Sequence, residues 1–475
     1  MGAGFSTVTP SGGSVNVTSV AQAVWSYTPR SLTDIQSLTT AIQNNDPSLL
    51  STLSDLIYVP APYYTGQVSA TQVAAFIDNA IRNYGMAGAF ASFISNYPYG
   101  LWSTSFVSNV VPYLTATSVA MLVTNQGMSA NSAQFILYWL AQNYYYNKWI
   151  YTVTASAPSS ITFSTNATLS TNVLIAQNIT IASGVTVTCG THTCFFVAQS
   201  FNNYGTIVAY GAPGGTPVTS GAVAGGTGGG GIAIIAVTAA LGTVNVAGSN
   251  GGNGVTLAYI GSGLTGVGGL FVILSGMTIP IGGTGGSADN VSVWAPAGYN
   301  GGGAGGGGYP SGGVGGGGGG IATAAYSFAS ANSMLTYILQ GVSDWWLINV
   351  VGKAPSSTTP LLTFYGSGGG SAAYYSGYVG SGSGGGGGGE AIIYAFNIIS
   401  GTVNAAGGAG GNSTAYSGGG GGGGGGFVFI LYGATSGSVT ANVAGGAGGV
   451  SSTGTLYGAT GANGTAYIAQ VTVNG

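Results

Sequence analysis

The glycine content of this chain constrains its fold more than any other feature. The chain has 475 residues and 93 glycines, most of them after residue 150, and the longest uninterrupted run is Gly418–Gly426. Glycine loses the most backbone entropy on folding and has no side chain to pack, so such a run cannot form an ordinary helix or central strand. The runs are therefore either flexible linkers or an element that only glycine can build.

A recurring pattern in the glycine-rich part argues against linkers. Each copy has a glycine, a short β-prone segment and a double glycine; the copies start at Gly205, Gly242, Gly276, Gly401 and, more loosely, Gly437. Three glycine runs directly precede apolar strands, at 228–231, 384–389 and 418–426. Repeats of this kind predict stacked units that share a core. Because the runs recur in register with the repeat, we favour packed polyglycine II helices with three residues per turn over linkers.

Charge is almost absent from the chain. Only 2% of the residues are charged and the net charge is −3, whereas an ordinary soluble domain is roughly 25% charged. Nucleic-acid binding is excluded, because no basic surface can neutralise phosphates. We expect no membrane span, because no stretch approaches the ~20 apolar residues that a spanning helix needs. Low charge also favours association, so we expect a homo-oligomer.

Helical patterning occupies the first third of the chain. Ser69 and Gln72 have the spacing of a capping box, apolar residues follow at helical intervals, and Gly85 marks the end. The period changes to that of strands near Trp149. The predicted fold class is α+β and multidomain. It comprises an extended arm over 1–32, a helical anchoring domain over 33–148, a β-rich connector over 149–204 and a glycine-rich repeat of β-strands and polyglycine II over 205–475.

Groups for catalysis are too few and too scattered to predict an enzyme or a cofactor. His192 is the only histidine, and the carboxylates after residue 150 are Asp289, Asp344 and Glu390, which nothing marks as a pair. No glycine run is followed by the Lys-Ser/Thr of a phosphate-binding loop.

Cys189 and Cys194 are the only cysteines, and three interpretations of them are open. They can form a disulfide that closes a β-hairpin loop in an oxidising setting, which we favour. They can remain free, or bind a metal together with His192. A fourth ligand is missing for the last option, so we predict no metal site.

Aromatic residues in the variable loops are the candidate binding residues. Aromatic rings dominate contact hot spots, and stacked repeats place their insertions on one face. The candidate receptor-binding residues are Trp294, Tyr299, Tyr309, Tyr374, Tyr375, Tyr378 and Tyr416.

The combination of polyglycine runs, apolar strands and variable loops resembles the glycine-rich tip adhesins of T-even-like phage tail fibres. Residues Ala23–Thr33 (AVWSYTPRSLT) are similar to a phrase in virus tail and fibre proteins, and the low charge resembles surface proteins of archaea from hot acidic springs and their viruses. The resemblance implies a viral attachment protein at the virion surface. Its N-terminal region would bind other virion proteins, and its loops would bind a host surface glycan or pilus. The alternative is an extracellular filament or sheath subunit of an acidophilic archaeon.

Overall fold

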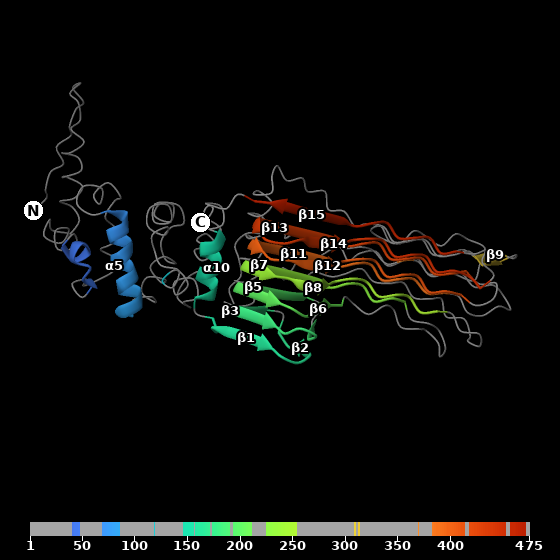
Figure 1. The fold of residues 1–475 in the computed structure, drawn as a ribbon, viewed down its shortest axis with the longest axis horizontal. Coiled ribbons are helices and arrows are strands. Elements are labelled where there is room, and N and C mark those ends of the chain that lie inside the picture. Colours follow the sequence, from blue (N-terminus) through green and yellow to red (C-terminus); the bar gives the residue numbers. More distant parts are fainter. Residues whose placement is uncertain are drawn as a thin grey trace, which may run out of the picture. The chain divides into compact units, whose positions relative to one another are not determined.

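The structure is a computed structural model. The residues that it describes are 40–47, 69–85, 118, 146–155, 157–171, 173–190, 193–210, 225–253, 308–309, 312–313, 369, 382–413, 418–452 and 457–471. The chain divides into two compact units, of which the first comprises residues 1–118 and 125–129 and the second the remainder. Figure 1 labels the helices and strands.

Helix α5, Ala70–Asn83, is the main described element of the first unit. Its capping box is confirmed: the Gln72 N–H donates to Ser69 Oγ at 3.2 Å, and the Ser69 N–H donates to Gln72 Oε1 at 2.8 Å. Gly85 follows the helix with a φ of 67°, a left-handed conformation that suits glycine. The predicted stop signal therefore lies where the helix ends.

The second unit is built from two parallel β-sheets whose strands alternate along the chain. The long sheet has the order β1 (Ser160–Phe163), β3 (Val173–Ile181), β5 (Thr193–Asn203), β7 (Gly231–Ala240), β11 (Glu390–Ile398), β13 (Phe427–Thr435) and β15 (Thr465–Gln470). The short sheet has the order β2 (Ala167–Leu169), β4 (Thr186–Cys189), β6 (Thr206–Ala209), β8 (Gly242–Asn245), β12 (Gly401–Asn404) and β14 (Val439–Asn442). A separate antiparallel pair joins β9 (Gly308–Tyr309) to β10 (Gly312–Gly313).

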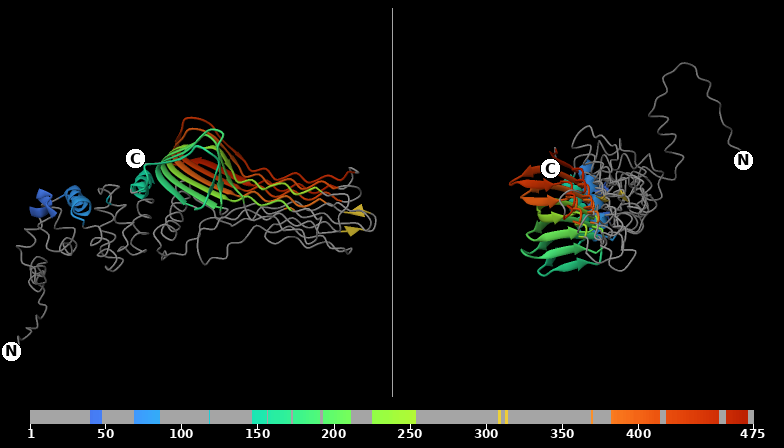
Figure 2. Two further views of the ribbon diagram at one scale, coloured as in Figure 1. Left: turned by 90° about the horizontal axis from the view of Figure 1, so that it is seen from below. Right: turned by 90° about the vertical axis from the view of Figure 1, so that its right-hand side faces the viewer.

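We call one strand of the long sheet together with the short-sheet strand that follows it a coil. Within each coil the chain runs along the long sheet, bends, and returns along the short sheet (Figure 2). The pairing skips one aligned position in each of β3, β5, β7, β11 and β13, for example Gln199 beside Val237. The alternation of side chains that face the core shifts by one residue there, so that Ala198 and Phe201, three residues apart, both belong to the core. An irregularity of this kind bends a strand, and its alignment lets these five strands bend together.

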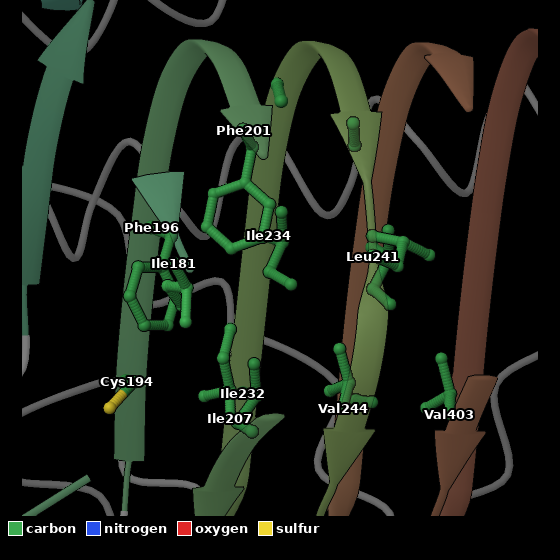
Figure 3. Packing of buried hydrophobic residues seen from close by; sticks show 14 of the residues in the cluster. Ile181, Cys194, Phe196, Phe201, Ile207, Ile232, Ile234, Leu241, Val244 and Val403 are labelled. Carbon is green, nitrogen blue, oxygen red and sulfur yellow. The ribbon is translucent and has the colours of Figure 1, made fainter. Parts of the chain in front are cut away.

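The core lies between the two sheets (Figure 3). Long-sheet residues such as Phe196, Phe201 and Ile234 meet short-sheet residues such as Val244 and Val403, and all of them are buried. The central strands β7, β11 and β13 contain continuous apolar runs in which both faces are buried, as is typical of parallel sheets that are covered on both sides.

Helix α10, Tyr146–Thr154, covers part of the other face of the long sheet. Trp149 is fully buried there, and the Tyr146 ring meets the Tyr394 ring edge-on, with the centroids 6.0 Å apart. The change to strand period that was expected at Trp149 comes later, because the helix continues to Thr154 and the first strand begins at Ser160.

The predicted fold class is wrong. Among the described residues, parallel strands in two sheets predominate and helices are few, so the chain is not a helical domain followed by a polyglycine II domain. The prediction separated a β-rich connector before residue 205 from the glycine-rich repeat, whereas strands β1 to β5 belong to the same two sheets as the later strands. The predicted boundary at 32 lies outside the described residues, and the one between 148 and 149 falls within helix α10.

Tyr394 leads to a prediction for alkaline conditions. Burial, and secondly the neighbouring Tyr146, raise the pKa of the Tyr394 hydroxyl well above its ordinary value of about 10. The folded chain therefore keeps this proton at pH values where the unfolded chain loses it. The contribution to stability is complete below about pH 10 and decreases as the pH rises, by about 1.4 kcal/mol per pH unit.

Urea unfolding of Tyr394→Phe between pH 9 and 11 should therefore show a shallower loss of stability than the unchanged chain shows. Tyr467→Phe, which removes an exposed hydroxyl on β15, is the control and should keep the original slope. Equal slopes in all three proteins would contradict the prediction.

Candidate functional site: the glycine layers and the loop bases

Glycine-rich extended segments connect the short sheet to the long sheet in the later coils. The outgoing segments follow β8, β12 and β14 and cover 246–253, 405–413 and 443–450. The returning segments precede β7, β11, β13 and β15 and cover 225–230, 382–389, 418–426 and 457–464. Figure 2 shows them continuing from the sheets as two layers, here called the outgoing layer and the returning layer. The loops that join the two layers lie outside the described residues.

Backbone hydrogen bonds connect these segments in more than one direction. The Gly388 N–H donates to the Gly424 carbonyl, 2.8 Å away in the next returning segment. The following N–H, of Gly389, donates to the Val246 carbonyl, 2.7 Å away in the outgoing layer. The pattern repeats every three residues along the segments. Sheets that pack through side chains lie about 10 Å apart, whereas these layers are directly hydrogen-bonded.

The need for glycine follows from this close approach. A Cβ on Gly422 would lie closer than 3.0 Å to the backbone of Gly446, and a Cβ on Gly423 would meet the backbone of Gly386 in the same way. Every residue of the Gly418–Gly426 run is buried. The linker interpretation is therefore wrong for this run, which is a packed element.

A segment that is surrounded by more neighbouring segments has more glycines in every three residues. The enclosed run Gly418–Gly426 is glycine throughout. Beyond the residues that pack on the core, the outgoing segments admit a side chain at every third residue; these residues are Ala247, Asn250, Asn253, Ala406, Ala409, Asn412, Ala444, Ala447 and Val450. An exception is Ser249, whose Oγ accepts a hydrogen bond from the Thr227 N–H at 2.7 Å. The last returning segment keeps glycine only at Gly458, Gly461 and Gly464, the positions where a Cβ would meet the preceding returning segment.

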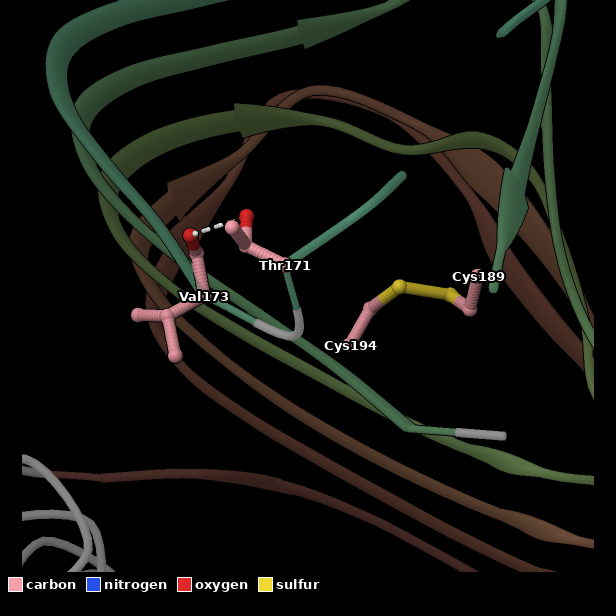
Figure 4. Close-up of a disulfide and its surroundings, with 4 residues drawn as sticks. All are labelled: Thr171, Val173, Cys189 and Cys194. Atoms are coloured by element: carbon pink, nitrogen blue, oxygen red, sulfur yellow. Dashed lines mark hydrogen bonds between the residues drawn. A yellow bond between two sulfur atoms is a disulfide. The ribbon is translucent and has the colours of Figure 1, made fainter. Parts of the chain in front are cut away.

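Cys189 and Cys194 are joined by a disulfide (Figure 4). It connects the end of β4 to the beginning of β5, with a Cα–Cα distance of 5.7 Å, and both residues are buried. The connection is short, in contrast to the later coils, in which the chain leaves through the glycine layers. The bond therefore holds the two sheets together on the side from which the layers extend.

Reduction of this disulfide should lower the stability of the second unit by about 2 kcal/mol, the loop entropy that a closed ring of this size contributes. The measurement is urea unfolding with and without a reductant. Cys189→Ala/Cys194→Ala should behave like the reduced chain, and its stability should not respond to the reductant. A reduced chain as stable as the oxidised one would contradict the prediction.

Most of the predicted binding residues lie outside the described residues: Trp294, Tyr299, Tyr374, Tyr375, Tyr378 and Tyr416. Tyr309 is in β9, where its backbone pairs with Gly312. His192, Asp289 and Asp344 also fall outside, and Glu390 is the buried first residue of β11. The described ranges contain no group of three metal-binding side chains, and within them no helix is long and apolar enough to cross a membrane.

The loop bases are the part of the candidate site that the structure describes. Ser413 and Ser451 form a parallel bridge where two outgoing segments end, and the Ser452 N–H donates to the Ser413 carbonyl at 3.2 Å. Tyr457, which begins the last returning segment, exposes 60% of its surface beside the loop over 453–456. The sequence already places it among the aromatic residues of the variable loops.

No protein-family model, no curated protein and no solved structure matches this chain.

Proposed function

We propose that the chain is a structural attachment protein of a virus, a tail, fibre or spike adhesin whose glycine layers present loops to the host surface. The construction of the loop bases carries this proposal. Backbone hydrogen bonds fix the segments on both sides of the loop over 414–417, from β12 to Ser413 and from Gly418 to β13. Loops on a rigid frame are common binding elements, because the frame fixes their ends while their sequence varies.

Two further properties support a place at the virion surface or elsewhere outside the cell. Disulfides persist in oxidising environments, and the second unit contains one. The chain has only four Lys or Arg residues, so trypsin-like proteases have few sites to cut. The partners that we propose are other virion proteins at the N-terminal region, further copies of the chain, and a host surface glycan or pilus at the loops. The proposed role requires neither catalysis nor a cofactor.

Electron microscopy of purified particles tests the location. Antibodies raised against residues 382–471 should label the outer ends of a tail, fibre or spike. Particles that remain unlabelled, while the same antibodies detect the chain only inside cells, would overturn the proposal.

Adsorption to host cells tests the orientation. Tyr457→Ser at the loop base should reduce particle adsorption roughly tenfold, as expected for an aromatic hot spot. Tyr204→Ser is a matched control, because Tyr204 is also 60% exposed but lies in the turn between β5 and β6, at the other end of the sheets. Equal adsorption of the two variants would count against binding at the loops.

An archaeal surface filament or sheath subunit is a second candidate, favoured by the open end of the stack. Strand β15 is an edge strand that exposes 37% of Tyr467 and 43% of Ile468 and contains neither Pro nor a charged residue. Such an edge can pair with another chain. This candidate predicts that the antibodies label cell-bound filaments, and that the purified chain forms filaments in a concentration-dependent way.

A further inference from the structure

The outer face of the short sheet carries rows of identical polar side chains. One row crosses five adjacent strands in register, with the residues Thr186, Thr206, Thr243, Thr402 and Thr440. A second row, two residues further along the strands, contains Asn245, Asn404 and Asn442. These eight residues are here called the threonine–asparagine face. The residues between the rows, such as Val244 and Val403, point into the core (Figure 3).

The spacing of this face is that of the sheet. Neighbouring strands lie about 4.8 Å apart, and residues two apart along a strand are separated by roughly 6.6 Å. The face is therefore a grid in which the same chemical group recurs at a constant interval across the strands. A ligand that also repeats along its length can satisfy many of these groups at once, and its many weak contacts add to a strong one.

Hydrogen bonds fix the asparagine row before any ligand arrives. Asn442 Nδ2 donates to Asn404 Oδ1 at 3.0 Å, and Asn404 Nδ2 donates to Asn245 Oδ1 at 3.3 Å. Each Oδ1 also accepts the backbone N–H two residues later, as Asn245 does from Ala247 at 3.1 Å. The side chains are thus already ordered, which lowers the entropic cost of binding.

The threonine row keeps hydrogen-bonding capacity toward solvent at Thr402 and Thr440, whereas Thr186, Thr206 and Thr243 are half-buried. Thr440 Oγ1 donates to Thr402 Oγ1 at 3.2 Å, and both residues are exposed. A hydroxyl offers one donor and two acceptor sites. Thr402 therefore still has its own hydrogen to donate after accepting the bond from Thr440.

The composition of the face selects the class of ligand. None of the eight residues is charged, so the face offers no cation to a nucleic acid or another polyanion. It also lacks the Trp, Tyr and Arg residues that anchor protein partners. A linear polymer of neutral sugars matches it, because such a chain is uncharged and presents hydroxyl groups at regular intervals.

We propose that the threonine–asparagine face binds a linear, uncharged polysaccharide that runs across the strands, with successive sugars placed over successive rungs. The inference rests on the proposed attachment function for its setting, because it identifies a glycan as the surface component that is bound. It adds a site on the side of the sheet body, separate from the loops.

The test is co-sedimentation of the purified full chain with insoluble cellulose, chitin and linear mannan. We expect binding to at least one of them, and Thr243→Val/Thr402→Val should raise the polysaccharide concentration for half-maximal binding at least tenfold. Valine has the shape of threonine without the hydroxyl and suits a strand. Thr162→Val is the matched control, because Thr162 is an exposed strand threonine on β1 of the long sheet.

The outcomes separate this proposal from the attachment function. Absence of binding to all three polysaccharides, or unchanged binding by a double variant that melts at the original temperature, would overturn the inference. Should the double variant fail to fold, Thr440→Val at the exposed edge strand must show weakened binding instead. The double variant can bind the polysaccharide more weakly, as expected, while antibodies against residues 382–471 do not label virions. That result would support the inference and contradict the viral function. Tyr457→Ser should leave polysaccharide binding unchanged.

Discussion

Replacing Gly422 by valine should destabilise the glycine layers by roughly 3–5 kcal/mol, the combined cost of an overpacked site and of buried backbone groups without partners. The new Cβ would lie closer than 3.0 Å to the Gly446 backbone. The outgoing and returning layers would have to separate there. The bond from the Gly446 N–H to the Gly423 carbonyl, 2.8 Å long, would be among those lost.

Ala447→Val provides the matched control. Ala447 follows Gly446 in the outgoing layer, but it is one of the exposed residues that recur at every third position. Surface changes of this kind usually alter stability by less than ~0.5 kcal/mol. Urea unfolding and limited proteolysis of the full chain measure both variants. An unchanged midpoint for Gly422→Val would show that the layers can separate at no cost, against the packing described here.

Phe201→Ala should cost about 3–5 kcal/mol, as is usual for truncation of a buried phenylalanine. Phe201 is fully buried between the sheets, and its ring centroid lies 5.4 Å from that of Phe196. It also lies just beyond the aligned irregularity in the long strands, where the chain bends toward the short sheet. Its loss would leave a cavity at the bend of a core that all the coils share.

Tyr204→Ala, three residues later and 60% exposed, should change stability by less than ~0.5 kcal/mol. Thermal and urea unfolding of the two variants, followed by circular dichroism, compare them directly. If Phe201→Ala were no more damaging than Tyr204→Ala, the core would have to be organised around other residues.

The sequence predicted the local signals correctly but not the way in which they combine. The capping box at Ser69 and Gln72 depends on residues three apart, and it was readable for that reason. The strands that follow the glycine runs were also readable, because β7, β11 and β13 each contain an apolar run of six residues. The pairing of β7 with β11 was not readable, because the residues between the two strands contain a further copy of the repeat, at Gly276.

The candidate site was predicted less well than the strands. The aromatic residues that were predicted to bind a receptor lie in loops that are almost entirely outside the described residues. The threonine and asparagine of the recurring GTVN segment were treated as parts of a repeat. Their common face becomes visible only when the register of β8, β12 and β14 is known. No local pattern in the sequence contains that register.

Because a side chain is admitted at one position in every three, the glycine layers have a fixed period of three residues. Deleting a single residue from 405–413 would move Ala406, Ala409 and Asn412 into positions that face backbone, and would move glycines to the surface. Lengths in these segments can therefore change only in steps of three. The loops beyond them have no such period, so insertions of any length can accumulate there while the supporting layers stay constant. The three-residue period of the backbone would therefore confine variation in length to the loops.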